Sequence, residues 1–381
     1  MGAIRVEHLF HAYDDGGREV RAVDDVSFDV EQNAFYTLLG PSGCGKTTTL
    51  RCIAGLEEPT SGEIELDGVA VVSARGIVPT NKRPIGMVFQ DYAVWPHMTV
   101  AENVAFPLKV AGDLSGREIQ AKVMDALALM GMEQFVQRRA TQLSGGQQQR
   151  LSLARALVRD PKVLLLDEPL SNLDAKLREQ MRAELRQLQR RIKVTTVFVT
   201  HDQVEALSMS TTIAVMNQGR IVQEGSPREI YLQPNSRFVA SFVGATNFVT
   251  GVVDAYDDDT RSAYLSTPAG PLCCRTEHAP EVGSAVTVAI RPEALEIGYE
   301  HPGRENLLEG RVQVGLFVGD AVDYRVRVGD QVFRVTGPQR SRFHRKDAVV
   351  LHVPADECVV IPDDPEVPAG VQATVQDQGA R

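Results

Sequence analysis

A glycine-rich segment near the N-terminus constrains this chain more than any other feature. It fits the pattern G-x-x-x-x-G-K-[ST] and reads Gly40-Pro41-Ser42-Gly43-Cys44-Gly45-Lys46-Thr47. A strand is expected over residues 34–39 and a helix over residues 47–56, so the segment joins a strand to a helix. Glycines let several backbone N–H groups face one anion, and the helix N-terminus adds its positive end. The pattern predicts a phosphate-binding loop in an α/β domain.

The residue types in this loop indicate a nucleoside triphosphate. Lys46 is expected to reach the β- and γ-phosphates, and the Thr47 hydroxyl is expected to bind Mg²⁺. ATP and Mg²⁺ are therefore the predicted ligands. The predicted nucleotide contacts in the loop are Ser42, Gly43, Cys44, Gly45, Lys46, Thr47 and Thr48.

A second apolar strand, over residues 163–167, ends in two carboxylates, Asp167 and Glu168. The carboxyl ends of parallel strands line the ligand crevice of an α/β sheet. Asp167 is predicted to hold Mg²⁺, and Glu168 to act as the general base on the attacking water. Because neighbouring strand residues point to opposite faces, Glu168 is expected to act at or just past the strand end.

Length and composition narrow the class of protein. The chain has 381 residues, which favours two domains, and its net charge of −10 argues against a nucleic-acid partner. No apolar run is long enough to span a membrane, and the N-terminus does not resemble a secretory signal. Five irregularly spaced cysteines fit a reducing cytoplasm better than a disulfide framework. Helical periodicity fades after about residue 242, where short β-branched strands take over.

The motif Leu143-Ser144-Gly145-Gly146-Gln147 lies between the phosphate loop and the acidic strand end. It predicts a second anion cradle at the start of a helix. With this motif the chain resembles the ATP-binding cassette (ABC) family, whose signature is LSGGQ. The resemblance covers roughly residues 3–242 and implies an α/β P-loop NTPase fold with a helical subdomain. It also implies that two copies pair head to tail, with Ser144, Gly145, Gly146 and Gln147 of one copy completing the ATP site of the other.

Further roles follow from the resemblance. Gln90 matches the glutamine that faces Mg²⁺ and the attacking water, and His201 matches the histidine that contacts the γ-phosphate. Asp174, in the segment 171–174, matches the loop that meets the other subunit. Tyr13 matches the aromatic residue that stacks on adenine, although a tyrosine near an N-terminal strand can simply be packed there. The predicted catalytic residues are Glu168, His201 and Gln90, and the predicted metal ligands are Thr47, Gln90 and Asp167.

Within the family, residues 95–103 and the C-terminal part resemble importers of the maltose, polyamine and ferric-iron kind. The expected organisation is a cassette over residues 1–242 with a helical subdomain at about 97–160, an all-β OB-like barrel over 243–361, and a disordered tail over 362–381. The implied partners are a second copy, transmembrane permease subunits and, indirectly, an extracytoplasmic solute-binding protein. A peripheral position on the cytoplasmic face of the inner membrane follows.

The expected activity is ATP hydrolysis coupled to solute uptake, with a slight preference for polyamine or ferric iron as the substrate. The alternatives are an importer ATPase for a sugar or another solute, and an ABC ATPase with no role in transport. The non-transport alternative usually carries two cassettes or a long coiled-coil insert, and this chain shows neither. A regulatory module that binds ATP without hydrolysing it is a further alternative. The presence of Lys46, Asp167, Glu168 and His201 argues against such a module.

Overall fold

The computed structural model describes residues 2–300 and 305–361, and the chain divides into two compact units. The first unit ends at Pro227 and the second begins at Arg228. Helix α8 (Arg237–Phe242) falls within the range predicted for the first domain but lies in the second unit. The Arg291 guanidinium donates to the carbonyl oxygen of Ala240 at 3.0 Å, which ties α8 to the β-rich part. The predicted tail 362–381 lies outside the described residues.

A six-stranded sheet organises the first unit, with strand order β11-β10-β3-β9-β8-β7. Its strands are β3 (Phe35–Leu39), β7 (Ile85–Val88), β8 (Val163–Asp167), β9 (Thr195–Thr200), β10 (Thr212–Asn217) and β11 (Arg220–Gly225). All neighbours are parallel except β10 and β11. Since β3 and β8 flank β9 in parallel, their carboxyl ends meet at one edge, where the glycine-rich loop and the acidic pair begin.

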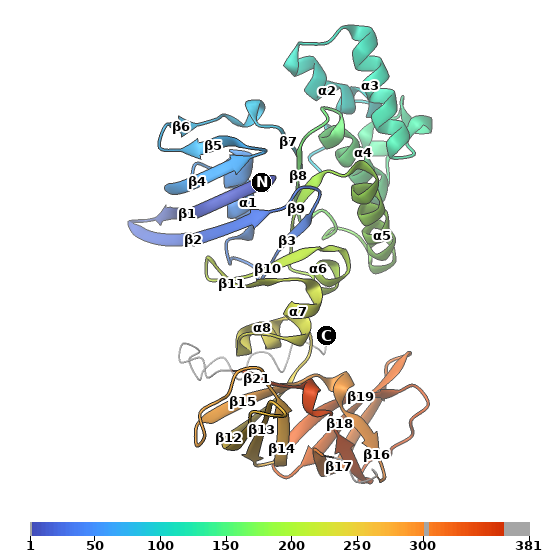
Figure 1. Cartoon of the computed structure of the whole chain (residues 1–381). Helices are drawn as coiled ribbons and strands as arrows, with labels where there is room; N and C mark the ends of the chain where they lie inside the picture. The colour runs from blue at the N-terminus through green and yellow to red at the C-terminus, as the bar shows by residue number, and fades with distance from the viewer. Residues whose placement is uncertain (1, 301–304, 362–381) are drawn as a thin grey trace. The chain divides into compact units, whose positions relative to one another are not determined.

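An antiparallel sheet covers one face of this parallel sheet, and helices cover the other (Figure 1). The antiparallel strands are β1 (Ile4–Asp15), β2 (Arg18–Val30), β4 (Ser61–Leu66), β5 (Val69–Ser73) and β6 (Gly76–Ile77). Alternate residues of β8 serve the two cores, because strand side chains point to opposite faces. Val163 and Leu165 pack with the antiparallel sheet and α1 (Lys46–Ala54), whereas Leu164 and Leu166 pack with the helices.

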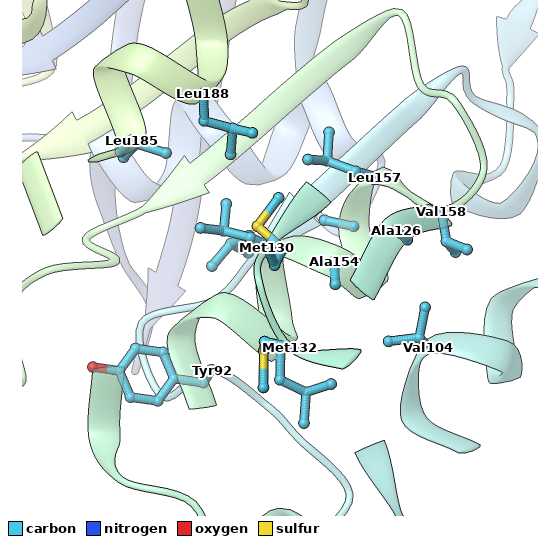
Figure 2. Close-up of a cluster of buried hydrophobic side chains, with 14 of the residues drawn as sticks. Tyr92, Val104, Ala126, Met130, Met132, Ala154, Leu157, Val158, Leu185 and Leu188 are labelled. Atoms are coloured by element: carbon cyan, nitrogen blue, oxygen red, sulfur yellow. The ribbon is translucent and has the colours of Figure 1, made fainter. Parts of the chain in front are cut away.

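The helical layer consists of α2 (Val100–Ala111), α3 (Gly116–Leu129), α4 (Gly145–Leu157), α5 (Ala175–Ile192) and α6 (Gln203–Met209). Figure 2 shows Val104, Ala126, Ala154 and Leu185 within one buried cluster, each from a different helix. Side-chain caps define several helix starts: Thr99 accepts from the Glu102 N–H, and Asp174 accepts from the Leu177 N–H. None of the helices in the described ranges is long and apolar enough to cross a membrane.

The second unit contains α7 (Pro227–Leu232), most of which follows the division, and two five-stranded antiparallel sheets around one core. One sheet has β14 (Gly270–Arg275), β13 (Ser262–Thr267), β12 (Asn247–Asp257), β15 (Ala285–Ile290) and β21 (Cys358–Ile361). The other has β16 (Glu296–Gly298), β20 (Ala348–His352), β17 (Leu307–Phe317), β18 (Ala321–Val328) and β19 (Gln331–Pro338). The edge strands β14 and β21 also contact each other, so the first sheet curls as a barrel does.

Candidate active site

The glycine-rich loop has a backbone that only glycine can adopt without strain. Gly45 has φ of +102° and directly precedes α1. A Cβ atom there would lie 2.1 Å from the carbonyl oxygen of Ala22, closer than any real contact. Gly43 also has a positive φ, of +81°, but the space around it is open. The glycine at position 45 is therefore required by both conformation and space, and the helix N-terminus that follows it carries partial positive charge.

Lys46 lies folded within this loop. Its Nζ donates to the carbonyl oxygens of Gly40 and Pro41, each at 2.8 Å, and lies 3.8 Å from the Cys44 Sγ. The side chain is buried, and in the described part of the chain its Nζ makes hydrogen bonds to carbonyl oxygens and a thiol. Burial raises the pKa of the Cys44 thiol, so the thiol is neutral beside the ammonium group. Among the described residues this ammonium group forms no ion pair with a carboxylate within 4 Å, and a buried ammonium group at a helix N-terminus suits a phosphate group.

Two of the three predicted metal ligands contact each other: Thr47, in the first turn of α1, and Asp167, at the end of β8. The Thr47 Oγ1 donates to the Asp167 Oδ1 at 3.0 Å. Burial raises the pKa of the Asp167 carboxyl, and the hydrogen bond from Thr47 opposes this rise. Hydroxyl and carboxylate oxygens are the hard ligands that Mg²⁺ prefers, so this donor set fits the predicted ion.

Glu168 leaves the alternation of β8 by a strained backbone turn. Its φ is +43°, an uncommon value for a residue with a Cβ. The Glu168 Oε2 lies 3.1 Å from the His201 Nδ1, at the end of β9. The Glu168 side chain is 17% exposed and that of His201 is 54% exposed, so the carboxylate is sheltered while the ring faces solvent. A carboxylate held by an imidazole in this way can accept a proton from water.

A small cavity beside this pair is lined by Glu168, Ser171, Arg178, Thr200, His201, Asp202 and Glu205. Four of these residues were not predicted as site residues from the sequence: Arg178, Thr200, Asp202 and Glu205. Thr200 Oγ1 donates to the buried Glu205 carboxylate at 2.6 Å, and burial raises the pKa of Glu205. Arg178 lies 3.5 Å from Asp202 and donates to the Leu173 carbonyl at 3.0 Å. From the sequence, Thr200 and Glu205 could have been recognised only because they lie close to His201 along the chain.

The remaining predicted residues lie around this centre. Gln90 follows β7 with its side chain exposed, and its carbonyl oxygen accepts from the Asn172 Nδ2 at 3.1 Å. Tyr13 is 41% exposed and its hydroxyl contacts Glu57 and, at 3.3 Å, the Thr48 Oγ1. Tyr13 therefore lies beside the start of α1, close to the phosphate loop. Asp174 is exposed at the start of α5, where it caps the helix.

The signature residues begin α4, the 13-residue helix Gly145–Leu157. Ser144 and Gly145 are exposed, whereas Gly146 is buried against Leu177. The Ser144 N–H donates to the Gln147 Oε1 at 3.0 Å. Among the described residues, hydrogen bonds from 144–147 stay within their own helix start and do not reach the glycine-rich loop. The described hydrogen bonds thus leave two separate glycine-rich helix starts, one at α1 and one at α4.

Two family models match the chain: one described as ABC transporter, over residues 23–171, and one described as TOBE domain, over residues 288–361. The spermidine/putrescine import ATP-binding protein PotA of Rubrobacter xylanophilus is 44% identical over 366 residues, covering 94% of this chain and 93% of that protein. This chain belongs to the ABC transporter family. A second ABC relative, the protein of the same name in Pseudomonas fluorescens, is 45% identical over 335 residues, covering 86% of this chain and 87% of that protein.

Solved structures of ABC proteins match about three fifths of the chain. The dimeric post-hydrolysis structure of the ATP-binding cassette MJ0796, bound to ADP and Pi, is 32% identical with a TM-score of 0.52, covering 59% of this chain and 99% of that one. The structure of cbiO1 from Clostridium perfringens is 31% identical with a TM-score of 0.54, covering 60% of this chain and 90% of that one. The ABC family, the fold class and the ATPase activity predicted from the sequence are confirmed. The chain is an ABC ATPase that binds ATP.

Proposed function

We propose that two copies of this chain bind and hydrolyse ATP between them and thereby drive polyamine import through separate membrane subunits. The observation that carries the chemistry is the Glu168–His201 pair beside the Thr47–Asp167 contact. The substrate rests on the relatives, because the spermidine/putrescine import proteins align with more than four fifths of this chain.

Thr47 and Asp167 would hold Mg²⁺, with Gln90 nearby, and the ion would supply neutralisation of phosphate charge. Lys46 would exchange its bonds to the Gly40 and Pro41 carbonyl oxygens for bonds to phosphate oxygens, since a charged acceptor binds an ammonium group more strongly than a carbonyl does. The loop residues 42–48 would bind the phosphates, and Tyr13 would stack on the adenine.

Glu168 would accept the proton of the attacking water at its free carboxylate oxygen. His201 Nδ1 holds Oε2 at 3.1 Å and so fixes the direction of the carboxylate. In a doubly protonated ring, the His201 Nε2–H would donate to the γ-phosphate while Nδ1–H donates to Glu168. The buried Glu205 and Thr200 support the end of β9 from which His201 projects.

The separation of the two glycine-rich helix starts within one chain supports a composite site. Residues 144–147 of one copy would close over ATP bound at residues 42–48 of the other, with Asp174 at the same interface. ATP is then part of the interface, so its binding favours the paired state and its hydrolysis releases that state. We place the pair, as peripheral subunits, on the cytoplasmic face of the inner membrane, beneath permease subunits that receive substrate from an extracytoplasmic solute-binding protein.

Capture of partners tests this proposal directly. Tagged Glu168→Gln protein, incubated with ATP and native membranes, is expected to co-purify with a multi-spanning permease that mass spectrometry identifies. Uptake of radiolabelled putrescine or spermidine by cells lacking the gene is expected to return with the wild-type chain and not with Glu168→Gln.

The matched control is Glu179→Gln, an exposed glutamate on α5, which should restore uptake fully. Recovery of ribosomal or DNA-repair proteins without a permease would contradict transport. Restored uptake of a sugar or of iron, but not of polyamines, would contradict the proposed substrate and leave the ATPase chemistry intact.

A further inference from the structure

Residues 92 and 93, just after Gln90, have an unusual backbone. Tyr92 has φ of +57° and Ala93 has φ of +48°, so two successive residues with a Cβ lie in the left-handed region. This region is strained for both residue types and persists only where surrounding groups hold it. The structure must therefore provide specific contacts that fix this turn.

One side chain of α4 holds both strained residues. The Arg155 guanidinium donates through Nη2 to the Tyr92 carbonyl oxygen at 2.8 Å and through Nη1 to the Ala93 carbonyl oxygen at 2.6 Å. Ser152, three residues earlier on the helix, donates to the same Tyr92 oxygen at 3.0 Å. The guanidinium carbon also lies 4.7 Å from the centre of the Trp95 ring. The planar fork of arginine makes these contacts simultaneously, which the single ammonium group of lysine cannot do.

The burial of Arg155 is not explained by a gain in folding stability. Arg155 is only 8% exposed, and burial lowers its pKa to about 10. Its polar contacts in the described part of the chain are carbonyl oxygens, with no carboxylate among them. A buried cation without a counter-ion carries a desolvation cost that an apolar side chain of similar size would avoid. The contacts therefore point to a positional role.

The geometry connects two functional segments of the same chain. Gln90 lies at one end of the strained turn, and its carbonyl oxygen is held by Asn172. At the other end, Arg155 fastens the turn to α4, whose first residues follow Ser144. In the composite arrangement, Gln90 serves the ATP bound by its own chain, whereas Ser144 serves the ATP bound by the partner. The turn therefore lies on the path between the two ATP sites.

We infer that Arg155 is a positioning residue that makes the Gln90 segment and α4 move as one body, so that ATP binding at one site is transmitted to the other. The inference rests on the proposed function, because it requires two composite sites. It assigns Arg155 no contact with ATP, and it predicts a loss of cooperativity rather than a loss of nucleotide binding.

The chain contains a probe at this position, because Trp95 is its only tryptophan. The experiment compares Arg155→Lys with Arg150→Ala in the full chain. Arg150 lies on the same helix and pairs with Glu184 at 2.7 Å, away from residues 90–95. Three quantities are measured: ATP affinity, the ATP dependence of hydrolysis, and the change in Trp95 emission on adding MgATP in a Glu168→Gln background, where turnover is blocked.

For Arg155→Lys we expect ATP affinity within about threefold of wild type and kcat lower by about tenfold. The Hill coefficient for ATP should fall from above one to about one, because two sites no longer communicate. The emission change should be lost, whereas Arg150→Ala should keep both the cooperativity and the emission change. Ser152→Ala, which removes one donor to the Tyr92 carbonyl, should shift each quantity in the same direction by less.

An Arg155→Lys protein that keeps wild-type cooperativity and emission change would overturn the inference, even if its melting temperature fell. If Arg155→Lys does not fold, Ser152→Ala decides: unchanged cooperativity and emission would overturn the inference. A wild-type chain that binds ATP without hydrolysing it would instead refute the proposed function, and the two failures are therefore distinguishable.

Discussion

Replacing Glu168 with glutamine separates proton transfer from every other role of this residue. Glutamine has nearly the same shape, and its amide oxygen can still face the His201 Nδ1, which lies 3.1 Å from the carboxylate. The strained backbone at Glu168, with φ of +43°, is the same for both residues. We therefore expect the free energy of unfolding to change by less than about 0.5 kcal/mol.

The catalytic effect should be much larger. An amide cannot accept the proton of the attacking water, and general-base catalysis contributes roughly 10²–10⁴-fold, or about 3–5 kcal/mol of transition-state stabilisation. Phosphate release at saturating MgATP should fall by this factor, while ATP affinity measured by equilibrium dialysis stays unchanged. Size-exclusion chromatography with ATP should show a stable dimer of the variant. Turnover within about threefold of wild type would refute the role of Glu168 as base.

Three further predictions concern the fold around the site. Gly45→Ala should lower the free energy of unfolding in urea by more than about 2 kcal/mol, because φ is positive there and the new Cβ would lie 2.1 Å from the Ala22 oxygen. Gly43→Ala, where the space is open, should lower the free energy of unfolding by only about 1 kcal/mol. Equal losses for the two variants would contradict this reasoning. Arg83→Leu should lower the free energy of unfolding by about 3 kcal/mol in the same urea measurement, because the buried guanidinium donates to the carbonyl oxygens of residues 52, 53 and 78. The control is Arg75→Leu at an exposed position, which should leave this free energy nearly unchanged. Since burial raises the pKa of Glu205, the folded state loses stability as pH rises from the ordinary glutamate value through the raised one. The melting temperature of Glu205→Gln relative to wild type should therefore be higher at pH 7.5 than at pH 4.5, and a pH-independent difference would contradict the assignment.

Local sequence patterns predicted β3, α1 and β8, the elements that carry the phosphate loop and the acidic pair. The parallel strands β3, β8 and β9 are short apolar runs, and α5 shows a clear three- to four-residue apolar spacing. The antiparallel β1 and the strands β12–β14 were not predicted. Glycine, proline and aspartate, which are depleted in strands, interrupt two of them: Gly251 and Asp254 in β12, and Gly270 and Pro271 in β14.

The sequence by itself determined the chemistry of the site, because the phosphate loop, the acidic strand end and the signature motif are each contiguous and rely on local backbone geometry. What only the tertiary structure decided is which distant groups meet. Thr47 contacts Asp167 across 120 positions, and His201 meets Glu168 because β8 and β9 are parallel neighbours in the sheet. Arg155 is a further case, because the sequence pattern around it predicts only that it lies on a helix. Its contacts with Tyr92 and Ala93 depend on a turn whose strained φ values are stabilised only when α4 packs against it.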